Sequence, residues 1–243
     1  MRLLDERVFG QAFSEVVLTG KWQEDSSYYP RYRSRYEAVL RTFAQLVQTP
    51  PVDVLEVGGG QLAALAAHLW HDRATVADIN TACFATLTDR RVETFQYNLA
   101  KEDPPVARSF DVVLLSEVIE HLPVPGHVAL RRLRRTLRPG GLLVCSTPNL
   151  YRLRNVIFLA MGRQIFDHFD VPSDAGVGHV LEYSAEHLRW QFEQAGFRNI
   201  EVSLREFAHA PTRRTDRVLA AIGKPLLRIP RFRDNLLATA VAP

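Results

Sequence analysis

The sequence predicts an α/β fold in which a doubly wound, mostly parallel sheet carries helices on both faces. Short apolar segments typical of buried strands recur along the chain, and helical segments lie between them. A run of three glycines joins the first of these strands to a helix. Alternating strands and helices form right-handed crossovers, which place a ligand at the carboxyl ends of the strands.

The composition is that of a globular protein rather than of a membrane or disulfide-rich protein. The chain has 243 residues, a net charge of +3 and two distant cysteines, Cys83 and Cys145, in apolar surroundings. It has no run of about 18 apolar residues, and acidic residues stand near the N-terminus where a secretory signal would be apolar. We therefore expect a cytoplasmic protein without a membrane span, with one catalytic domain in residues 51–243.

Residues 1–50 are expected to form an N-terminal helical lid. Apolar residues recur at helical spacing in residues 9–18 and again in residues 36–47. The aromatic and basic segment 28–36 between them has two interpretations. Either its rings simply pack on the domain, or the segment covers a small-molecule pocket and one of its arginines reaches a carboxylate.

The first strand, residues 52–57, contains Glu56 and runs into Gly58-Gly59-Gly60-Gln61 and a helix over residues 62–70. A strand, a glycine turn and a helix place backbone N–H groups and a helix N-terminus beside a ligand, with no side chains in the way. This arrangement predicts a nucleotide-type ligand at the turn.

The next two strands also end in polar residues. The strand over residues 74–77 is followed by Asp78 and Ile79, and this aspartate lies 18 positions beyond Gly60. That offset is close to the one at which a carboxylate binds a ribose diol in doubly wound nucleotide sites. The strand over residues 92–97 is followed by Asn98 and Leu99, where an amide can face an adenine edge.

The fourth strand, residues 110–116, ends at Ser116 and is followed directly by Glu117. A helix is expected over residues 126–137, with Arg138-Pro139-Gly140-Gly141 as its stop signal and a fifth strand over residues 142–146. Several polar residues and glycines should therefore meet at one edge of the sheet: Glu56, Gly58, Asp78, Asn98 and Glu117.

These motifs together resemble those of a class I S-adenosylmethionine-dependent methyltransferase over about residues 50–205. Residues 54–60 resemble its glycine-rich first motif, Asp78 its ribose-binding acid, and residues 110–113 and 137–141 its later motifs. Two positions depart from the family pattern, Gly59, where cysteine is more frequent, and Gln61, where a small residue is common. The resemblance implies S-adenosylmethionine as cofactor, bound by Glu56, Gly58, Gly59, Gly60, Asp78, Ile79, Asn98, Leu99 and Ser116.

The resemblance also implies a seven-stranded, Rossmann-like methyltransferase sheet. A helix over residues 185–194 should precede the strand at residues 196–202, and an antiparallel last strand should follow at residues 236–241. Residues 150–178 then form an acceptor-binding insertion. Residues 207–233 form a second insertion, helical near residues 217–222, which covers the active site or makes an oligomer contact.

The sequence Glu117-Val118-Ile119-Glu120-His121 indicates a metal site. Two carboxylates one helical turn apart, with an adjacent imidazole, suit Mg²⁺ or Mn²⁺. The motif resembles those of small-RNA 2′-O-methyltransferases and ubiquinone-biosynthesis O-methyltransferases, and a later histidine supplies His179 as fourth ligand. In the alternative interpretation, Glu117 approaches the cofactor and His121 only packs.

The expected activity is O-methylation of a sugar hydroxyl on a glycan, polysaccharide precursor or glycosylated natural product. A cation would activate the hydroxyl, while His121, His179 or a metal-bound water takes the proton, with Glu117 in the catalytic group. Modest net charge disfavours a nucleic-acid partner and favours a small-molecule or oligosaccharide acceptor. The alternatives are a small-RNA 2′-O-methyltransferase, a quinone or phenol O-methyltransferase, and an inactive cofactor-binding partner subunit. Residues 1–35 and 207–233 offer contacts for a homodimer.

Overall fold

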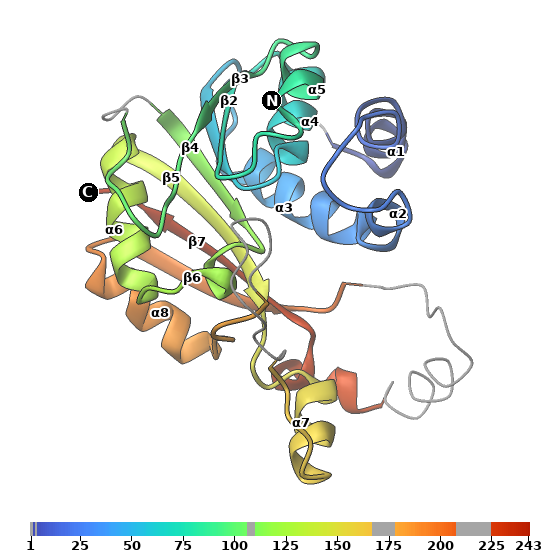
Figure 1. Cartoon of the computed structure of the whole chain (residues 1–243), viewed down its shortest axis with the longest axis vertical. Coiled ribbons are helices and arrows are strands. Elements are labelled where there is room, and N and C mark those ends of the chain that lie inside the picture. Colours follow the sequence, from blue (N-terminus) through green and yellow to red (C-terminus); the bar gives the residue numbers. More distant parts are fainter. Residues whose placement is uncertain (1, 3, 106–109, 167–177, 208–224) are drawn as a thin grey trace.

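The structure is a computed structural model of the chain, and it describes residue 2 and residues 4–105, 110–166, 178–207 and 225–243 (Figure 1). The described residues form a seven-stranded sheet with the order β3-β2-β1-β4-β5-β7-β6, in which β7 is antiparallel to both neighbours. The strands are β1 Asp53–Val57, β2 Arg73–Asp78, β3 Glu93–Gln96, β4 Phe110–Ser116, β5 Leu137–Pro148, β6 Arg198–Arg205 and β7 Asn235–Val241.

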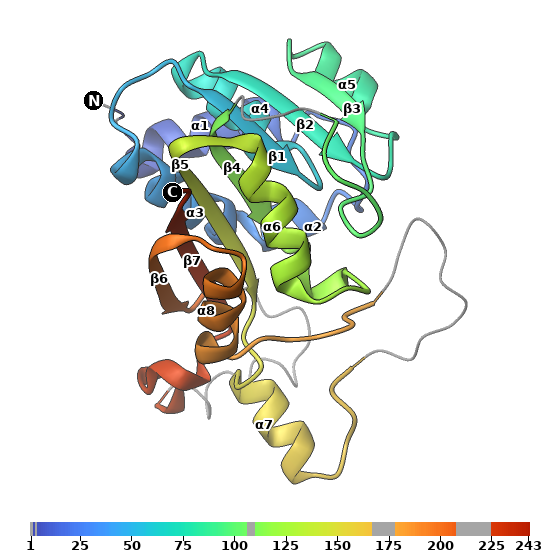
Figure 2. The ribbon, with the colours of Figure 1, turned by 90° about the vertical axis from the view of Figure 1, so that its left-hand side faces the viewer.

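Helices cover both faces of this sheet, as the alternation in the sequence predicts (Figures 1 and 2). One face carries α1 Glu6–Val16, α3 Arg33–Leu46, α4 Gln61–Trp70 and α5 Phe84–Thr88, and the other carries α6 Gly126–Thr136 and α8 Ala185–Gln194. Successive residues of β4 alternate between the two cores, with Val112 and Leu114 on the first face and Val113 and Leu115 on the second. Burial on both faces is why residues 112–115 of this strand are all apolar.

The N-terminal helices belong to the first of these two cores. Phe9 and Phe13 of α1 and Phe43 of α3 are fully or almost fully buried together with Leu62 of α4. In addition, Arg2 donates two hydrogen bonds to the buried carboxylate of Asp72, of 2.6 and 2.8 Å. α1 and α3 are therefore packed as part of the main core, while α2 Tyr28–Arg31 and the start of α3 face the pocket described below.

The start of β5 differs from the prediction. The expected stop signal Arg138-Pro139-Gly140-Gly141 lies inside the strand, which begins at Leu137 directly after α6. The register with β4 shifts between Phe110 and Val112, and Gly140 has a φ of +78°. Because glycine adopts this conformation without strain, the chain makes an irregularity within the strand instead of a separate loop. Arg138 fixes it by ion pairs to Asp53 and Asp111.

Two segments beyond the end of β5 protrude from the body of the molecule. They contain α7 Leu153–Ala160 and two short 3-10 helices, η2 Leu226–Arg228 and η3 Pro230–Phe232. The helix expected near residues 217–222 lies outside the described residues. Among the helices that the structure describes, none combines the length and the apolar character needed to cross a bilayer.

Candidate functional site

The glycine turn after β1 adopts a backbone that other residues would strain. Gly58, Gly59 and Gly60 have φ values of +85°, +85° and +109°. A Cβ at Gly58 would lie 2.5 Å from Cγ2 of Val118, so a side chain there would also clash. The turn thus brings backbone N–H groups to the carboxyl edge of the sheet, as predicted.

Glu56, in the strand that leads into this turn, binds the start of the helix that follows it. Its buried carboxylate accepts a 2.7 Å hydrogen bond from the Ala63 backbone N–H in the first turn of α4, where Gly60 has no side chain with which to cap the helix. Burial raises the pKa of Glu56 to about 8. The residue therefore stabilises the turn as well as lining the pocket.

Asp78, at the end of β2, lies beside the glycine turn. Its Oδ2 accepts hydrogen bonds from Gly59 N (2.8 Å) and Gln23 Nε2 (3.2 Å), and its Oδ1 accepts one from Asn80 N (2.8 Å). Parallel pairing of β1 with β2 places the aspartate there. Its carboxylate therefore lies against the backbone of the glycine turn.

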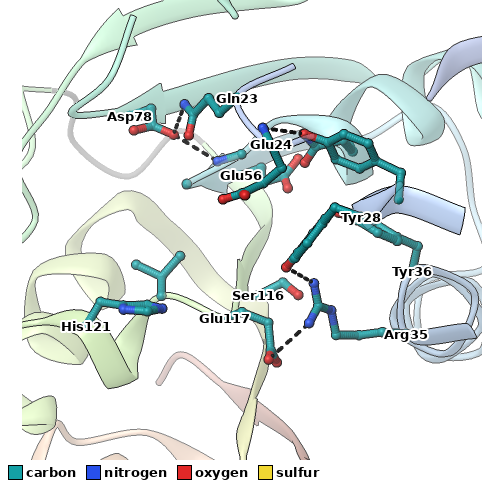
Figure 3. Close-up of a pocket in the computed structure, with 15 residues that line it drawn as sticks. Gln23, Glu24, Tyr28, Arg35, Tyr36, Glu56, Asp78, Ser116, Glu117 and His121 are labelled. Atoms are coloured by element: carbon teal, nitrogen blue, oxygen red, sulfur yellow. Dashed lines mark hydrogen bonds and ion pairs between the residues drawn. The ribbon is translucent and has the colours of Figure 1, made fainter. Parts of the chain in front are cut away.

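A cavity of about 230 Å³ opens between this turn, the end of β4 and the N-terminal segment (Figure 3). Of the predicted site residues, Glu56, Gly58, Gly59, Asp78, Ser116, Glu117 and His121 line it. Others that line it were not predicted as site residues: Gln23, Glu24, Tyr28, Tyr29, Arg35, Tyr36, Gln61 and Val118. Tyr28, Tyr29, Arg35 and Tyr36 belong to the aromatic and basic segment in which a lid was expected.

Four predicted cofactor residues do not line this cavity. Gly60 lies deeper, against Leu87. Ile79 accepts a hydrogen bond from Gln96 through its carbonyl, Asn98 uses Oδ1 to accept from Ala100 N, and Leu99 is buried. The amide of Asn98 thus stabilises the loop after β3.

Arg35 connects the N-terminal segment to the end of β4. Its NH1 lies 3.1 Å from Oε2 of Glu117, and its NH2 donates a 2.8 Å hydrogen bond to the hydroxyl of Tyr28 (Figure 3). The rings of Tyr28, Tyr32 and Tyr36 surround the guanidinium at 4.8 to 5.7 Å. One arginine of the segment therefore does reach a carboxylate, that of the protein itself.

Glu117 is fixed in a single orientation by several donors. It has a φ of +54°, and its carboxylate accepts hydrogen bonds from Ser146 Oγ (2.9 Å) and Asn235 Nδ2 (3.2 Å) besides the ion pair with Arg35. Ser116, the last residue of β4, shares a hydrogen bond with the same Ser146. The partners come from α3, β5 and β7, so Glu117 points toward these elements.

The structure brings together three of the four predicted metal ligands. Ligand atoms of Glu120, His121 and His179 lie within 4.8 Å of one another, and Glu117 is not part of this cluster. Glu120 and His121 lie in η1 Ile119–His121, and the two imidazole rings meet edge to face at 4.9 Å. His179 reaches them because Val180 N donates to the Glu120 carbonyl.

Glu120 is the most deeply buried member of this cluster. It is fully buried, its Oε2 accepts a hydrogen bond from Thr147 Oγ1 (3.0 Å), and its Oε1 has no hydrogen-bond partner among the described residues. Oε1 lies 3.9 Å from Nε2 of His121. Burial, and then the charge of Glu117, raise the pKa of Glu120 well above its usual range. A carboxylate oxygen and two imidazoles suit a divalent cation, so the residues present fit one.

A buried carboxylate orients His179. Glu182 Oε1 accepts a 3.0 Å hydrogen bond from His179 Nδ1, which leaves Nε2 to act as a metal ligand. Asn155 of α7 donates to the other oxygen at 2.6 Å, and Arg152 forms an ion pair with Glu182. Sequence reasoning missed this set, although a glutamate three residues after a predicted ligand is a signal that could have found Glu182.

The strand order, the reversed last strand and a glycine turn beside an acidic strand end together define a class I methyltransferase fold. Residues 28–202 match the model of a family described as "Methyltransferase domain". This match covers most of the chain, and the chain belongs to that family.

Curated relatives agree with this assignment. The chain is 34% identical over 166 residues to a "Probable S-adenosylmethionine-dependent methyltransferase" of Mycobacterium tuberculosis, with 65% of this chain and 53% of the relative covered. It is 40% identical over 96 residues to a "Ubiquinone biosynthesis O-methyltransferase" of Cereibacter sphaeroides, with 38% of each covered. The chain thus spans about half or less of the length of these relatives.

Solved structures share the fold at low identity. A Thermotoga maritima S-adenosylmethionine-dependent methyltransferase, described as a "possible histamine N-methyltransferase", superposes with a TM-score of 0.61 at 15% identity, covering 97% of this chain and all of that one. Phosphoethanolamine N-methyltransferase 2 of Haemonchus contortus, in complex with S-adenosyl-L-methionine, gives 0.58 at 17% identity, covering 86% of this chain and 52% of that one. At these identities the similarity shows the fold.

Proposed function

We propose that the protein is an S-adenosylmethionine-dependent O-methyltransferase that uses a divalent cation to methylate a sugar hydroxyl. The observation that carries the proposal is the cluster of Glu120, His121 and His179, in which the buried Oε1 of Glu120 has no hydrogen-bond partner among the described residues. His121 belongs both to this cluster and to the cavity beside the glycine turn. His121 can therefore bind a cation in the cluster and also contact a cofactor in the cavity.

The cavity offers complementary groups to each part of the cofactor. Asp78 suits the ribose hydroxyls, and the turn at Gly58 and Gly59 lets a ligand approach the backbone closely. Arg35 supplies the one guanidinium among the described residues that line the cavity. The carboxylate of a methionine group would therefore compete with Glu117 for this arginine. Because Arg35 belongs to the N-terminal segment, this segment would act as the lid over the cofactor.

Glu120, His121 and His179 would hold the cation. A bound Mg²⁺ or Mn²⁺ stabilises the alkoxide form of a hydroxyl, which is otherwise a poor nucleophile near neutral pH. Glu182 keeps the lone pair of His179 Nε2 directed at the cluster by accepting the hydrogen bond from Nδ1. Arg152 and Asn155, which hold Glu182, lie at the start of α7 in the segment where the acceptor is expected.

The acceptor segment supports a sugar but also a second candidate. Tyr151 is exposed and Phe158 is partly exposed near Arg154, and such faces stack on sugar rings or on planar rings. The similarity to ubiquinone-biosynthesis O-methyltransferases favours a quinone or phenol hydroxyl as the alternative. A phenol is more acidic than a sugar hydroxyl, so its methylation should depend less steeply on the cation.

The decisive experiment measures methyl transfer to a panel of glycosides and phenols after removal of divalent ions. We expect turnover to vanish in excess chelator and to return with Mg²⁺ or Mn²⁺. His179→Ala should abolish turnover, whereas His68→Ala, a partly exposed histidine on α4 paired with Glu15, should not change it. Full activity of metal-free protein would refute the role of the cation, and activity on phenols alone would refute the sugar acceptor.

A further inference from the structure

The two protruding segments after β5 and before β7 lie at the same end of the molecule (Figures 1 and 2). Asn149 joins them, because its Nδ2 donates 2.8 Å hydrogen bonds to the carbonyls of Arg231 and Arg233. We call the described residues 150–166 and 225–233 the distal face. It contains α7, η2 and η3.

Exposed apolar side chains are concentrated on the distal face. The described residues include ten large apolar side chains that are exposed, and five of them lie here: Tyr151, Leu159, Met161, Leu226 and Ile229. Leu159 and Met161, at and just after the end of α7, are 58% and 59% exposed, the highest values of the ten. Such a concentration is typical of an interaction surface.

The charge of the distal face is uniformly positive. It carries six arginines and no aspartate or glutamate: Arg152, Arg154, Arg163, Arg228, Arg231 and Arg233. In the sequence of the two insertions, residues 150–178 and 207–233, ten Lys and Arg stand against four Asp and Glu. The rest of the chain has 20 Lys and Arg against 23 Asp and Glu, so the positive excess of the protein resides in these insertions.

We propose that the distal face binds the surface of an anionic lipid bilayer. Guanidinium groups pair with anionic headgroups, while exposed leucine, isoleucine and methionine side chains enter the boundary with the acyl chains. Arg152 is paired with Glu182, so a two-fold contact between copies would place the other five arginines against five of the second copy, which is unfavourable. RNA would account for the arginines, but four of the five exposed apolar side chains are aliphatic and offer no ring on which bases stack.

The distal face adjoins the proposed cation cluster. Arg152 and Asn155 hold Glu182, which in turn accepts a hydrogen bond from His179. A docked protein would therefore face its acceptor segment toward the membrane, which specifies the acceptor class as a lipid-linked one. This last step rests on the proposed function, whereas the lipid binding itself does not.

Vesicle co-sedimentation of the full chain tests the proposal. We expect the protein to sediment with vesicles of phosphatidylglycerol and phosphatidylcholine, to stay in solution with phosphatidylcholine alone, and to be partly released by high salt. Leu159→Glu with Met161→Glu should lower the vesicle affinity at least about tenfold. Arg154→Gln with Arg163→Gln should do so by a similar factor.

The matched control is Leu18→Glu with Leu46→Glu, which adds the same charge at exposed leucines outside the distal face. Its vesicle affinity should stay within about twofold of that of the unmodified protein, apart from the small effect of net charge. Retained S-adenosylhomocysteine binding shows that each variant is folded.

Three results would overturn the proposal: no sedimentation with anionic vesicles, equal losses in the distal and control variants, or a dimer that Leu159→Glu with Met161→Glu dissociates. If the protein does not sediment with anionic vesicles but binds RNA, and if Leu159→Glu with Met161→Glu leaves the RNA affinity unchanged, the first of these results would indicate RNA as the partner. Because the assay needs no methyl transfer, an inactive protein that binds vesicles contradicts only the proposed function.

Discussion

Two glutamates three residues apart, Glu117 and Glu120, have opposite environments. The left-handed backbone at Glu117 turns its carboxylate toward Arg35, Ser146 and Asn235. Glu120 is buried, and one of its oxygens accepts no hydrogen bond from the residues that the structure describes. The first is a structural anion and the second is a candidate ligand. Spacing alone treats both as ligands, because the φ of a single residue is not visible in a sequence pattern.

Glu120→Gln should therefore weaken Mn²⁺ binding more than Glu117→Gln does. We expect a loss of affinity of at least about tenfold for the first variant and a smaller loss for the second, since only Glu120 lies in the cluster. Isothermal titration with Mn²⁺ measures both. Equal losses would place Glu117 among the ligands after all.

Glu182→Gln tests the orientation of His179. An amide in place of the carboxylate is a weaker acceptor for the Nδ1 hydrogen bond, so Mn²⁺ affinity should fall by about 10- to 100-fold. Glu186→Gln, an exposed position in the first turn of α8, is the matched control and should bind Mn²⁺ like the unmodified protein. Unchanged affinity in both variants would exclude the orienting role of Glu182.

Glu56 makes the stability of the fold depend on pH. Because burial raises its pKa in the folded state from 4.5 to about 8, the folded state binds the extra proton between these values, and stability falls as pH rises through this window. The free energy of unfolding should decrease by on the order of 5 kcal/mol from the acidic to the basic end of this window. In Glu56→Gln this part of the decrease should disappear, which urea titrations at several pH values can check.

At the scale of elements, the strands and helices were largely predictable, whereas the N-terminal lid was only one of two interpretations and its individual contacts to the pocket were not predicted. Strands buried on both faces give continuous apolar segments, so β1 and β4 were found within one residue. By contrast, Gln23 meets Asp78 across 55 positions of sequence, and no local pattern records such a contact. The contact between Asn155 of α7 and Glu182 was missed for the same reason, because the two residues are 27 positions apart in the sequence.

The contact between α3 and the end of β4 should contribute to stability more than surface ion pairs do. The side chains of Arg35 and Glu117 are 8% and 15% exposed, so Arg35→Gln leaves a mostly buried carboxylate short of its cation and should cost about 3 kcal/mol. Arg73→Gln, whose side chain is 65% exposed in its pair with Asp53, should cost clearly less, because water screens an exposed pair. Urea denaturation of the two variants would reveal the contrast, and similar values would contradict it.

At the scale of the whole molecule, the predicted division at residue 50 does not coincide with a division of the core. Phe9 and Phe43 are buried in the same cluster as Val54 of β1 and Leu62 of α4. The segment around α2 can cover a ligand, but α1 and α3 are fixed against the sheet. A helical pattern in a sequence does not indicate which surface the helix packs on.

Phe9→Ala should accordingly destabilise the whole protein. Loss of a fully buried ring costs about 3 to 5 kcal/mol, and the variant should unfold in one transition seen equally by circular dichroism and tryptophan fluorescence. Val8→Ala, at an exposed neighbour on α1, should cost less than about 1 kcal/mol. Separate transitions for the helices and the sheet would instead indicate an independent N-terminal unit.

The close approach of Val118 to Gly58 has a thermodynamic consequence. Val118 stands between Glu117 and Glu120 in the chain, and its methyl group occupies the space where a side chain at Gly58 would be. The loop that carries the candidate ligands thus rests on the turn that carries the candidate cofactor site. Two coupled sites in one molecule change each other's affinity by the same factor. If the cation raises the affinity for the cofactor, the cofactor must therefore raise the affinity for the cation by that factor.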